Sequence, residues 1–445
     1  MRDTIFAPAT APGRSAVAVV RISGPKTAAA LRSLAGRLPP PRTLSRRRLA
    51  WDGQPLDEAL AVWFPGPASY TGEDCAELQL HGGAAVVAGV TEALGALGLR
   101  FAAPGEFTRR AFEGGRLDLD EAEAVADLVE AETQGQARQA LAQLGGALGA
   151  RYTAWRGALL EALALLEAAV DFADEDLPPD LIERASLGLD ALIGEMAAAL
   201  GQAKRGEAVR EGYRVAIVGA PNAGKSSLLN ALVGRDAAIV TATPGTTRDV
   251  IEAPLTIEGF KVLVADMAGV RTTCEPIEAE GVRRATAWAE AAALRLWVVD
   301  GGASDGAWGE AAALTQAGDL LVLNKADLPR GSDAGAAAAA AAAKQVAVLE
   351  VAAGRGEITA LREALAARVR GELAGADFPA VTRQRHAALL EEALACVRRG
   401  AAELATPELA AEDLRLAARA MERIAGRIGA EEVLDRIFAS FCIGK

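Results

Sequence analysis

The most informative segment of this chain reads Gly219-Ala220-Pro221-Asn222-Ala223-Gly224-Lys225-Ser226. The apolar run 215–218 precedes it, and leucines 228, 229 and 232 follow it at helical spacing. A strand that leads through a Gly-rich loop into a helix presents backbone N–H groups and the positive helix end to phosphate. We expect Gly219 and Gly224 to allow close approach of the backbone, Lys225 to reach the β- and γ-phosphates, and Ser226 to ligate Mg²⁺.

The region around this loop alternates strand and helix patterns from about residue 212 to residue 370. Short apolar runs that predict strands lie at 215–218, 262–265, 296–299, 320–323 and 346–351. Helical patterns separate them, which is typical of a parallel sheet covered by helices. The chain contains a single phosphate loop.

Length and composition indicate a globular protein with several domains. The 445 residues are 51% hydrophobic and 24% charged, and the formal net charge is −12. One hydrophobic core does not grow to this size, so two to four domains are expected. The negative charge argues against nonspecific coating of nucleic acid. Any RNA contact then needs a local basic patch, for which 46–48 and the stretch around Arg383 and Arg385 are candidates, although short basic runs are more often simply solvated.

The cysteines and the N-terminus argue against a disulfide scaffold, a structural zinc site and a membrane protein. Cys75, Cys274, Cys396 and Cys442 are widely scattered and have no CxxC or Cys/His spacing. The N-terminus lacks a basic segment followed by an apolar run, and no stretch reaches about 18 uncharged apolar residues. We expect a cytoplasmic protein.

The patterns divide the chain into three kinds of domain. Residues 1–118 alternate apolar runs with turn signals, which predicts a small α/β domain. Residues 119–210 and 373–445 have long helical periodicity and are expected to form one all-α domain, into which the α/β domain 211–372 is inserted. The low-complexity tract Ala336–Ala343 is expected to be a solvent-exposed helix and is assigned no role.

A second motif selects the base of the nucleotide. Asn324-Lys325-Ala326-Asp327 follows the strand predicted at 320–323. The carboxylate of Asp327 can accept hydrogen bonds from N1–H and the exocyclic amine of guanine, whereas adenine would leave that charge unpaired. In this order after a phosphate loop, the motif predicts GTP rather than ATP.

Two further segments complete the predicted nucleotide site. Asp266 ends the strand predicted at 262–265 and places a carboxylate near Mg²⁺, while Gly269 offers an N–H to the γ-phosphate. Thr246 and Thr247 lie on a segment where one hydroxyl can complete the magnesium shell. Val270 follows Gly269 where many small GTPases have a water-orienting Gln. Another group must therefore assist hydrolysis, and the residues alone leave Glu275, Glu278, Glu280 and a cation held by Asn222 as candidates.

At this point the chain resembles the tRNA modification GTPase family called MnmE or TrmE, over nearly its whole length. The opening residues 3–5 and 21–25 are similar to those of the family. Further matches are 69–74, Glu77, 81–83, 104–108 and 117–119 in the folate domain, and the C-terminal Phe441-Cys442-Ile443-Gly444-Lys445. These matches lie outside the phosphate-loop domain and are independent of it.

The resemblance implies a multidomain fold with an N-terminal folate-binding and dimerisation domain, a helical domain and an inserted GTPase domain. It implies K⁺-stimulated GTP hydrolysis in a homodimer that works with a FAD-dependent partner. Together they would add a carboxymethylaminomethyl group to C5 of the wobble uridine of certain tRNAs. The one-carbon unit would come from 5-formyl- or methylene-tetrahydrofolate.

The resemblance also assigns roles to residues. Asn222, Thr241, Thr243 and Thr246 would surround K⁺, Ser226 and Thr247 would ligate Mg²⁺, and Glu278 falls on the catalytic glutamate. The nucleotide site then comprises Asn222, Ala223, Gly224, Lys225, Ser226, Ser227, Thr241, Thr246, Thr247, Asp266, Gly269, Asn324, Lys325 and Asp327. The folate positions are Arg21, Glu77, Arg116 and Lys445, with Cys442 as a possible further site residue.

The chain departs from the family pattern at several positions. Arg116 replaces the usual Lys, Met267 replaces a Thr, and Ala352 stands where the family usually has Ser beside the base. The first loop, 13–18, lacks the usual extra glycines. These departures affect the expected affinity for folate and nucleotide rather than the type of site.

Two other functions are weighed. A ribosome-assembly GTPase switch without modification chemistry would need a second GTPase domain or a KH module, and the KH-like stretch 426–429 lies in helical surroundings without the strands of that module. A degenerate scaffold is disfavoured because Lys225, Ser226, Asp266 and Asp327 are all present.

Overall fold

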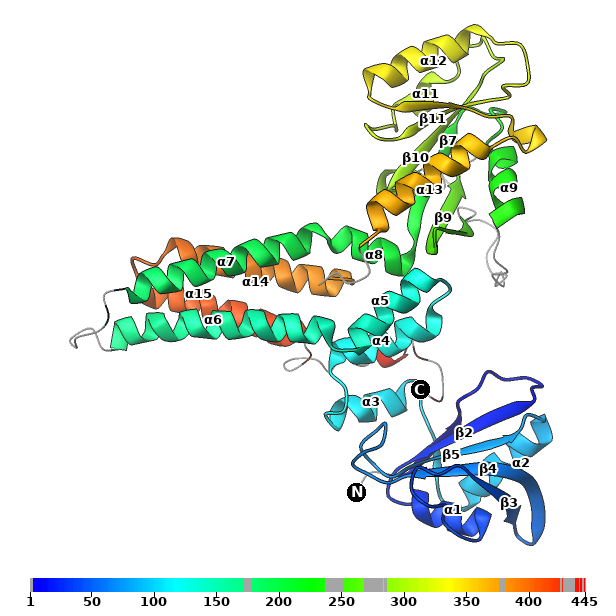
Figure 1. Ribbon diagram of the computed structural model, residues 1–445, viewed down its shortest axis with the longest axis vertical. Coiled ribbons are helices and arrows are strands. Elements are labelled where there is room, and N and C mark those ends of the chain that lie inside the picture. The colour runs from blue at the N-terminus through cyan, green and yellow to red at the C-terminus, as the bar shows by residue number, and fades with distance from the viewer. Residues whose placement is uncertain are drawn as a thin grey trace. The chain divides into compact units, whose positions relative to one another are not determined.

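The computed structural model describes residues 3–171, 178, 180–236, 252–267, 283, 286–375, 381–424, 426, 437–439, 441 and 444. Its contacts divide the chain into two compact units. The first consists of Met1–Ala126, Gln143–Leu192 and Glu392–Lys445, and the second of Asp127–Ala142 and Ile193–Glu391. Figure 1 shows the elements of both.

The first unit begins with a six-stranded sheet in the order β3-β4-β5-β2-β1-β6. β1 and the short β6 pair in parallel, and all other neighbours are antiparallel. Alternation of apolar and polar residues gives each strand one buried face. The strands are β1 (Ile5–Pro8), β2 (Val17–Ser23), β3 (Ser45–Trp51), β4 (Gln54–Phe64), β5 (Cys75–His81) and β6 (Arg100–Phe101).

Two helices cover one face of this sheet. α1 (Thr27–Ala35) and α2 (Ala84–Ala96) pack on it around a core that includes Ile22, Leu78 and Leu94. On the opposite face, Phe107 of α3 (Glu106–Glu113) packs with Ile5 and Ala7. The prediction of a small α/β domain at the N-terminus is confirmed.

The helical elements of the chain follow the periodicity of its leucines and alanines. α6 (Ala147–Asp171) packs along α15 (Pro407–Ile424), and an ion pair of 2.8 Å joins Arg156 to Glu422 across them. The remaining helices are α4 (Leu119–Glu130), α5 (Gln134–Leu144), α7 (Leu181–Gly201), α8 (Ala203–Glu211) and α14 (Gln384–Ala402). None of the helices in the described residues is long and apolar enough to cross a membrane.

The second unit contains a six-stranded sheet in the order β12-β11-β10-β7-β9-β8. Only the β8–β9 pair is antiparallel, which confirms the predicted, mostly parallel sheet. The apolar runs coincide with β7 (Tyr213–Gly219), β9 (Phe260–Asp266), β10 (Leu294–Asp300), β11 (Leu320–Asn324) and β12 (Ala347–Glu350). The sixth strand, β8 (Glu252–Ile257), was not predicted, because it is a largely half-exposed edge strand without a continuous apolar run.

Helices cover both faces of this second sheet (Figure 1). α8, α9 (Lys225–Asp236) and α13 (Thr359–Leu373) contribute to one core, and α11 (Gly309–Ala312) and α12 (Ser332–Ala343) to the other. The alanine tract is helical, as expected, but the expectation of an exposed helix was correct for only one face of it. Ala337 and Ala341 are fully buried, because small side chains let α12 lie close against β10 and β11.

α5 is attached to the β8–β9 turn within the second unit. The N–H of Gly135, in the first turn of the helix, donates to the carbonyl of Gly259 at 2.9 Å, and Lys261 pairs with Glu132 at 2.6 Å. A Cβ at Gly135 would lie 2.7 Å from the ring of Phe260. A glycine is therefore required for this close approach between helix and hairpin.

Candidate functional site: a phosphate loop and an N-terminal cavity

The phosphate loop lies at the carboxyl end of β7, in the middle of the second sheet. β9 and β10 flank β7 as parallel neighbours, so Asp266 at the end of β9 lies beside the loop. Ligands of open α/β sheets bind at this edge. Gly224 has φ of 92°, and a Cβ there would lie 2.1 Å from Nδ2 of Asn324. The loop therefore packs directly against the motif that follows β11.

Lys225 and Ser226 begin α9 at the end of the loop. Nζ of Lys225 donates to the carbonyls of Gly219 and Ala220, each at 2.9 Å, and the residue is only 8% exposed. Oγ of Ser226 donates to Oδ2 of Asp266 at 2.7 Å. The lysine ammonium and the N-terminus of α9 give the loop the positive character that a polyphosphate needs.

The carboxylate of Asp266 fits a magnesium site. Among the described residues its buried Oδ1 has no hydrogen-bond partner, while Oδ2 accepts from the Ser226 hydroxyl. A buried, unpaired carboxylate oxygen is costly unless a cation or donor satisfies it. An oxygen donor set of hydroxyl and carboxylate is the kind that Mg²⁺ takes. The third predicted ligand, Thr247, lies outside the described residues.

The base-reading motif after β11 is held from several sides. Nδ2 of Asn324 donates to the carbonyl of Ala223 at 2.9 Å, and its Oδ1 accepts from the N–H of Ala353 at 3.1 Å. Asn324 thus joins the phosphate loop to the segment after β12. Lys325 has φ of 58° and its Nζ pairs with Oδ2 of Asp300 at 2.6 Å.

Asp327 carries an ion pair of its own. Its Oδ2 lies 2.9 Å from Nε of Arg355, in the short 3₁₀ helix Ala353–Arg355. The Arg355 side chain is 62% exposed and the Asp327 side chain 22% exposed. Ala352 has no hydroxyl to offer this carboxylate, so within the described chain Arg355 is its charged neighbour. Because only Oδ2 is engaged in this pair, the carboxylate retains acceptor sites for a base.

A second site lies in the N-terminal domain, where a cavity of about 280 Å³ opens beside β2 and β5. Nε and Nη2 of Arg21 both donate to Oε1 of Glu77, at 3.0 and 2.9 Å. The guanidinium carbon of Arg21 lies 5.4 Å from the centre of the Tyr70 ring, and Nη1 donates to the carbonyl of Gly444 at 3.4 Å. The cavity is lined by Arg21, Arg42, Phe64, Ala68, Ser69, Tyr70, Cys75, Ala76, Glu77 and Arg116.

The cavity combines aromatic surface with charge. The guanidinium of Arg42 lies over the Phe64 ring at 5.8 Å. Burial raises the pKa of Tyr70, although its hydrogen bond with Thr108 and the charge of Arg21 oppose the shift, so its phenol remains protonated. Flat rings with a carboxylate and several guanidinium groups suit a ligand that has both a heteroaromatic ring and acidic groups.

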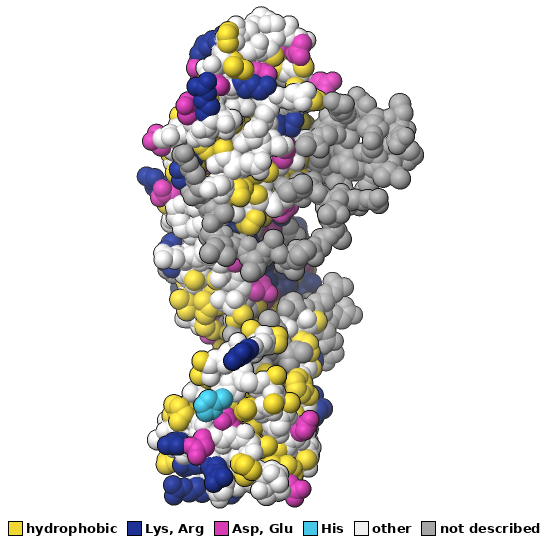
Figure 2. All heavy atoms as spheres, turned by 90° about the vertical axis from the view of Figure 1, so that its right-hand side faces the viewer, with side chains coloured by type: hydrophobic (Ala, Val, Ile, Leu, Met, Phe, Trp, Pro, Cys, Tyr) yellow, Lys and Arg dark blue, Asp and Glu magenta, His cyan; other side chains and the backbone are white. Residues whose placement is uncertain are grey.

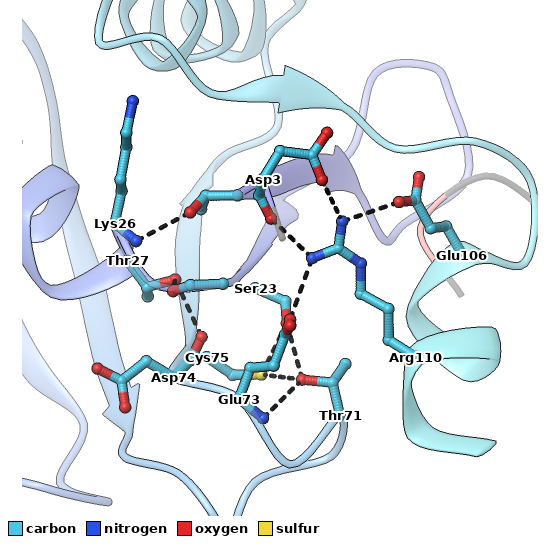
Figure 3. A network of polar contacts seen from close by, with 12 residues as sticks. Asp3, Ser23, Lys26, Thr27, Thr71, Glu73, Asp74, Cys75, Glu106 and Arg110 are labelled. Carbon is cyan, nitrogen blue, oxygen red and sulfur yellow. Dashed lines mark hydrogen bonds and ion pairs between the residues drawn. The ribbon is translucent and has the colours of Figure 1, made fainter. Parts of the chain in front are cut away.

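A polar network borders this cavity and holds the start of the chain (Figure 3). Arg110, only 5% exposed, donates to Asp3, Glu73 and Glu106 over distances of 2.7 to 3.1 Å. Glu73 also accepts from Oγ of Ser23 at 3.0 Å, and Ser23 in turn lies 2.7 Å from Oγ1 of Thr71. The network therefore fixes β1 and the loop before β5 against α3.

Comparison with known proteins addresses the whole chain. The description "MnmE helical domain" matches residues 119–442, and "GTP-binding protein TrmE N-terminus" matches residues 4–116. The chain is 59% identical over 447 residues to the tRNA modification GTPase MnmE of Phenylobacterium zucineum, and the match covers all of both chains. The chain belongs to the MnmE family. It is 58% identical to the MnmE of Caulobacter vibrioides over both full lengths, and 52% identical to that of Rhodospirillum rubrum over 99% of the relative. These matches confirm the resemblance inferred from the motifs.

In this MnmE-family chain, the structure groups the predicted site residues in two places. Ala223, Gly224, Lys225, Ser226, Asp266 and Asn324 are joined by direct contacts at the phosphate loop, with Lys325 and Asp327 next to Asn324. Asn222, at φ of 64°, and Ser227 are exposed beside them. The predicted residues Thr241, Thr243, Thr246, Thr247, Gly269, Glu278, Cys442 and Lys445 lie outside the described residues. Arg21, Glu77 and Arg116 line the N-terminal cavity.

Sequence reasoning missed four residues of these two sites. Asp300 is the last residue of the apolar strand β10, which lies beside the strand that leads into the phosphate loop. An acidic residue at the carboxyl end of such a strand is a signal that could have indicated its place near the site. Arg355 reaches Asp327 from a different segment of the chain, and Arg42 with Phe64 joins the cavity through strand pairing and a turn. These three depend on tertiary contacts and had no local sequence signal.

Proposed function

We propose that this chain hydrolyses GTP and acts in tRNA modification. With a FAD-dependent partner, it would add a carboxymethylaminomethyl group to C5 of the wobble uridine of certain tRNAs, using a one-carbon unit from 5-formyl- or methylene-tetrahydrofolate. The observation that carries the proposal is the full-length similarity to relatives named tRNA modification GTPase MnmE. The joined phosphate loop, magnesium carboxylate and base-reading motif support its nucleotide part.

In this proposal the phosphate loop binds the triphosphate through its N–H groups and Lys225. Ser226 and Asp266 would hold Mg²⁺, directly or through a water, and Thr247 is assigned as a further ligand on the family resemblance. Magnesium supplies charge stabilisation between the β- and γ-phosphates when it is bound. Asn324 keeps the base-reading segment against the loop, because its amide bridges Ala223 and Ala353.

Guanine selection is assigned to Asp327, with Lys325 beside it. Arg355 binds one oxygen of the Asp327 carboxylate and so limits rotation of this side chain. In this proposal Arg355 takes the role of the Ser hydroxyl that the family usually has at position 352. The two hydrogen bonds from guanine would then meet a carboxylate that is already oriented. Charge-assisted hydrogen bonds of this kind contribute about 1.5–3 kcal/mol each.

Water activation is assigned to Glu278, and K⁺ binding to Asn222 with Thr241, Thr243 and Thr246. Asn222 is an exposed residue of the phosphate loop, with φ of 64°, so its side chain is accessible from solvent. The apolar Val270 cannot orient water, so an acidic residue of the following segment is needed. This part rests on the family resemblance.

The N-terminal cavity is proposed to bind the tetrahydrofolate derivative. The Glu77 carboxylate suits the donor groups of a pterin, and Arg21 and Arg116 suit the glutamate carboxylates of folate. The carbonyl of Gly444 accepts a hydrogen bond from Arg21, and this contact supports a role for the C-terminal motif at the cavity. Lys445 and Cys442 are assigned to the site on the family resemblance alone. The chain is further proposed to form a homodimer through this domain, which light scattering of the purified protein would test.

The deciding experiment is nucleoside analysis of tRNA from cells that lack this protein. We expect the carboxymethylaminomethyl group at the wobble uridine to disappear and to return with the wild-type gene. Complementation with Lys225→Ala, which removes the phosphate-binding ammonium, is expected not to restore it. A wobble uridine that stays fully modified in the deletion strain would contradict the proposal.

A further inference from the structure

The N-terminal domain carries an unusual distribution of charge. Between Thr4 and Trp51 the chain has no acidic residue at all, although the whole protein has 59 acidic and 47 basic residues. The basic residues in this stretch are Arg14, Arg21, Lys26, Arg32, Arg37, Arg42, Arg46, Arg47 and Arg48. A polyanion that approaches this acidic protein is attracted to such a basic region.

Five of these arginines gather around one edge of the first sheet. Arg46, Arg47 and Arg48 lie on β3, which pairs only with β4 and so ends the sheet. α1 packs against β3, and Arg32 in its last turn and Arg37 just after it are exposed. Arg46 and Arg48 are exposed, whereas Arg47 is half-buried on the other face of the strand, the face that carries the buried Leu49 under α1. We call Arg32, Arg37, Arg46, Arg47 and Arg48, which surround this edge from both faces, the β3 arginine surface. Figure 2 shows Lys and Arg side chains gathered on this end of the N-terminal domain.

The strand geometry sets the spacing of these groups. Arg46 and Arg48 point to the same face because side chains alternate along a strand, and their Cα atoms are about 6.6 Å apart. This is of the order of the separation between successive phosphates in a nucleic-acid strand. The Arg46 side chain is 78% exposed. Exposed guanidinium groups at this spacing can each bind one phosphate with two parallel hydrogen bonds.

Nearby acidic groups neutralise only part of the surface. Glu58 of β4 pairs with Arg46, and that hydrogen bond together with the charge of Arg46 lowers the pKa of Glu58. Asp57 is engaged by His81, accepting from its backbone N–H at 2.8 Å and lying 2.7 Å from its Nδ1. Among the described residues, Arg32 and Arg37 have no hydrogen-bonded acidic partner, and Arg48, which stands opposite Glu58 in the strand register, interacts with this carboxylate only through its charge. The surface therefore keeps a net positive charge.

We propose that the β3 arginine surface is a docking site for the sugar-phosphate backbone of tRNA. The inference rests on the proposed function, which makes tRNA the substrate, and adds where on the chain its backbone binds. Arginine without lysine at this edge favours the bidentate recognition of phosphate over a diffuse attraction to an anionic surface. Arg42 is left out because it lies over Phe64 in the folate cavity.

The test measures binding of total tRNA to the full-length protein by fluorescence anisotropy at several KCl concentrations. For Arg46→Gln/Arg48→Gln we expect about a 10-fold loss of affinity near 0.1 M salt and a salt slope smaller by about 1.5 than that of wild type. The matched control is Arg330→Gln/Arg370→Gln, which removes two arginines that are 65% and 62% exposed in the second unit. The control is expected to bind within about 2-fold of wild type and with the same slope.

A third variant is expected to change tRNA affinity in the opposite direction. Glu58→Gln removes the carboxylate that neutralises Arg46, so tRNA binding is expected to tighten several-fold and its salt slope to steepen. Circular dichroism and GTP hydrolysis without tRNA are expected to match wild type in all three variants, which separates a lost docking site from a misfolded domain.

Several results would overturn the inference. One is that Arg46→Gln/Arg48→Gln binds tRNA with the same affinity and the same salt slope as wild type. If the variant also supports tRNA modification in cells, the docking site is wrong but the proposed function is unaffected. A second contrary result is loss of the dimer in that variant, measured by light scattering, because the surface would then be an interface between two copies of the chain. A third is that the wild-type protein binds phosphatidylserine vesicles more tightly than tRNA. Failure of wild type to bind tRNA and to modify it would remove both proposals together.

Discussion

Oγ of Ser226 lies 2.7 Å from Oδ2 of Asp266, although 40 residues separate them in sequence. The contact joins the first turn of α9 to the end of β9, and Oδ1 of Asp266 stays buried with no hydrogen-bond partner in the part of the chain that the structure describes. Two oxygens from different elements thus face one point beside the phosphate loop. This geometry makes a direct prediction about magnesium.

Ser226→Ala is expected to raise the Mg²⁺ concentration needed for half-maximal GTP hydrolysis and to lower kcat by about 10- to 100-fold, the usual cost of losing a metal-site residue. Asp266→Asn, which weakens the carboxylate, is expected to act in the same direction. Hydrolysis measured over a Mg²⁺ titration tests both. Ser332→Ala, at the exposed start of α12, is the control. An unchanged Mg²⁺ dependence in both site variants would show that this pair does not hold the metal.

Asp327→Asn is expected to change the base preference. The amide keeps one acceptor and gains donors, so guanine loses a charge-assisted hydrogen bond while xanthine, with a carbonyl at C2, gains a partner. Loss of about 2 kcal/mol corresponds to a roughly 30-fold weaker GTP affinity. Titration with fluorescent GTP and xanthosine triphosphate measures the change, with Asp305→Asn in an exposed loop as control. The assignment fails if the variant retains the wild-type ratio of the two affinities.

The strands and the order of the nucleotide motifs were predictable because they have local signals. The apolar runs that became β7, β9, β10 and β11 are buried on both faces, and such runs are the clearest sequence mark of a parallel sheet. The Gly-rich loop and the 324–327 motif lie directly after two of these strands. The loop and the 324–327 motif contact each other through Asn324 because β7 and β11 both lie next to β10 in the sheet and end at the same edge.

What could not be predicted depends on contacts between distant segments. The close approach of Gly135 to Phe260 attaches α5 to the β8–β9 hairpin, yet the helical periodicity of α5 only shows that it is a helix. Burial of Ala337 and Ala341 likewise depends on how close α12 can come to the sheet, since alanine is equally common on exposed helices. Arg355, the partner of Asp327, belongs to this class too.

Hydrolysis is expected to be faster in K⁺ than in Na⁺, and Glu278→Ala is expected to bind GTP normally while losing most turnover. The apolar Val270 leaves water orientation to another group, and general-base assistance of this kind contributes about 10²- to 10⁴-fold. Single-turnover hydrolysis in matched KCl and NaCl, with nucleotide affinity measured separately, tests both statements. Glu290→Ala, on a helix of the same domain, is the control. Normal turnover in Glu278→Ala would return the role to Glu275 or Glu280.

Arg21→Gln is expected to weaken binding of 5-formyl-tetrahydrofolate by at least about 10-fold, because it removes a charged donor that holds Glu77 and faces the cavity. Glu77→Gln removes the carboxylate acceptor for the pterin and is expected to have a similar effect. GTP hydrolysis is expected to stay unchanged in both variants. Calorimetry measures the difference, and the control is Arg109→Gln, a half-exposed arginine of α3 outside the cavity lining. If both variants bind as wild type does, the cavity is not the folate site.

The network around Arg110 predicts a pH-dependent stability of the N-terminal domain. The hydrogen bond from Arg100, supported by Arg110, lowers the pKa of Asp3 from 3.8 to about 2 despite slight burial. A carboxyl whose pKa is lowered by folding stabilises the fold above its unfolded pKa and loses this contribution as the pH falls toward its folded pKa. Because the Asp3 side chain is 54% exposed, solvent screening limits the contribution to less than about 1 kcal/mol.

Asp3→Asn is therefore expected to reduce the protection of 5–8 in hydrogen exchange at pH 7 by less than about 5-fold, the factor that 1 kcal/mol allows. Between pH 4 and pH 2 the difference from wild type is expected to shrink, since Asp3 of the unfolded wild-type chain becomes protonated there while the folded chain must take up its proton near pH 2. Arg110→Met, which leaves Glu73 and Glu106 without their buried cation, is expected to cost about 3–5 kcal/mol and to show the larger loss at pH 7. A difference between Asp3→Asn and wild type that grows on acidification would show that Asp3 is not held as its anion.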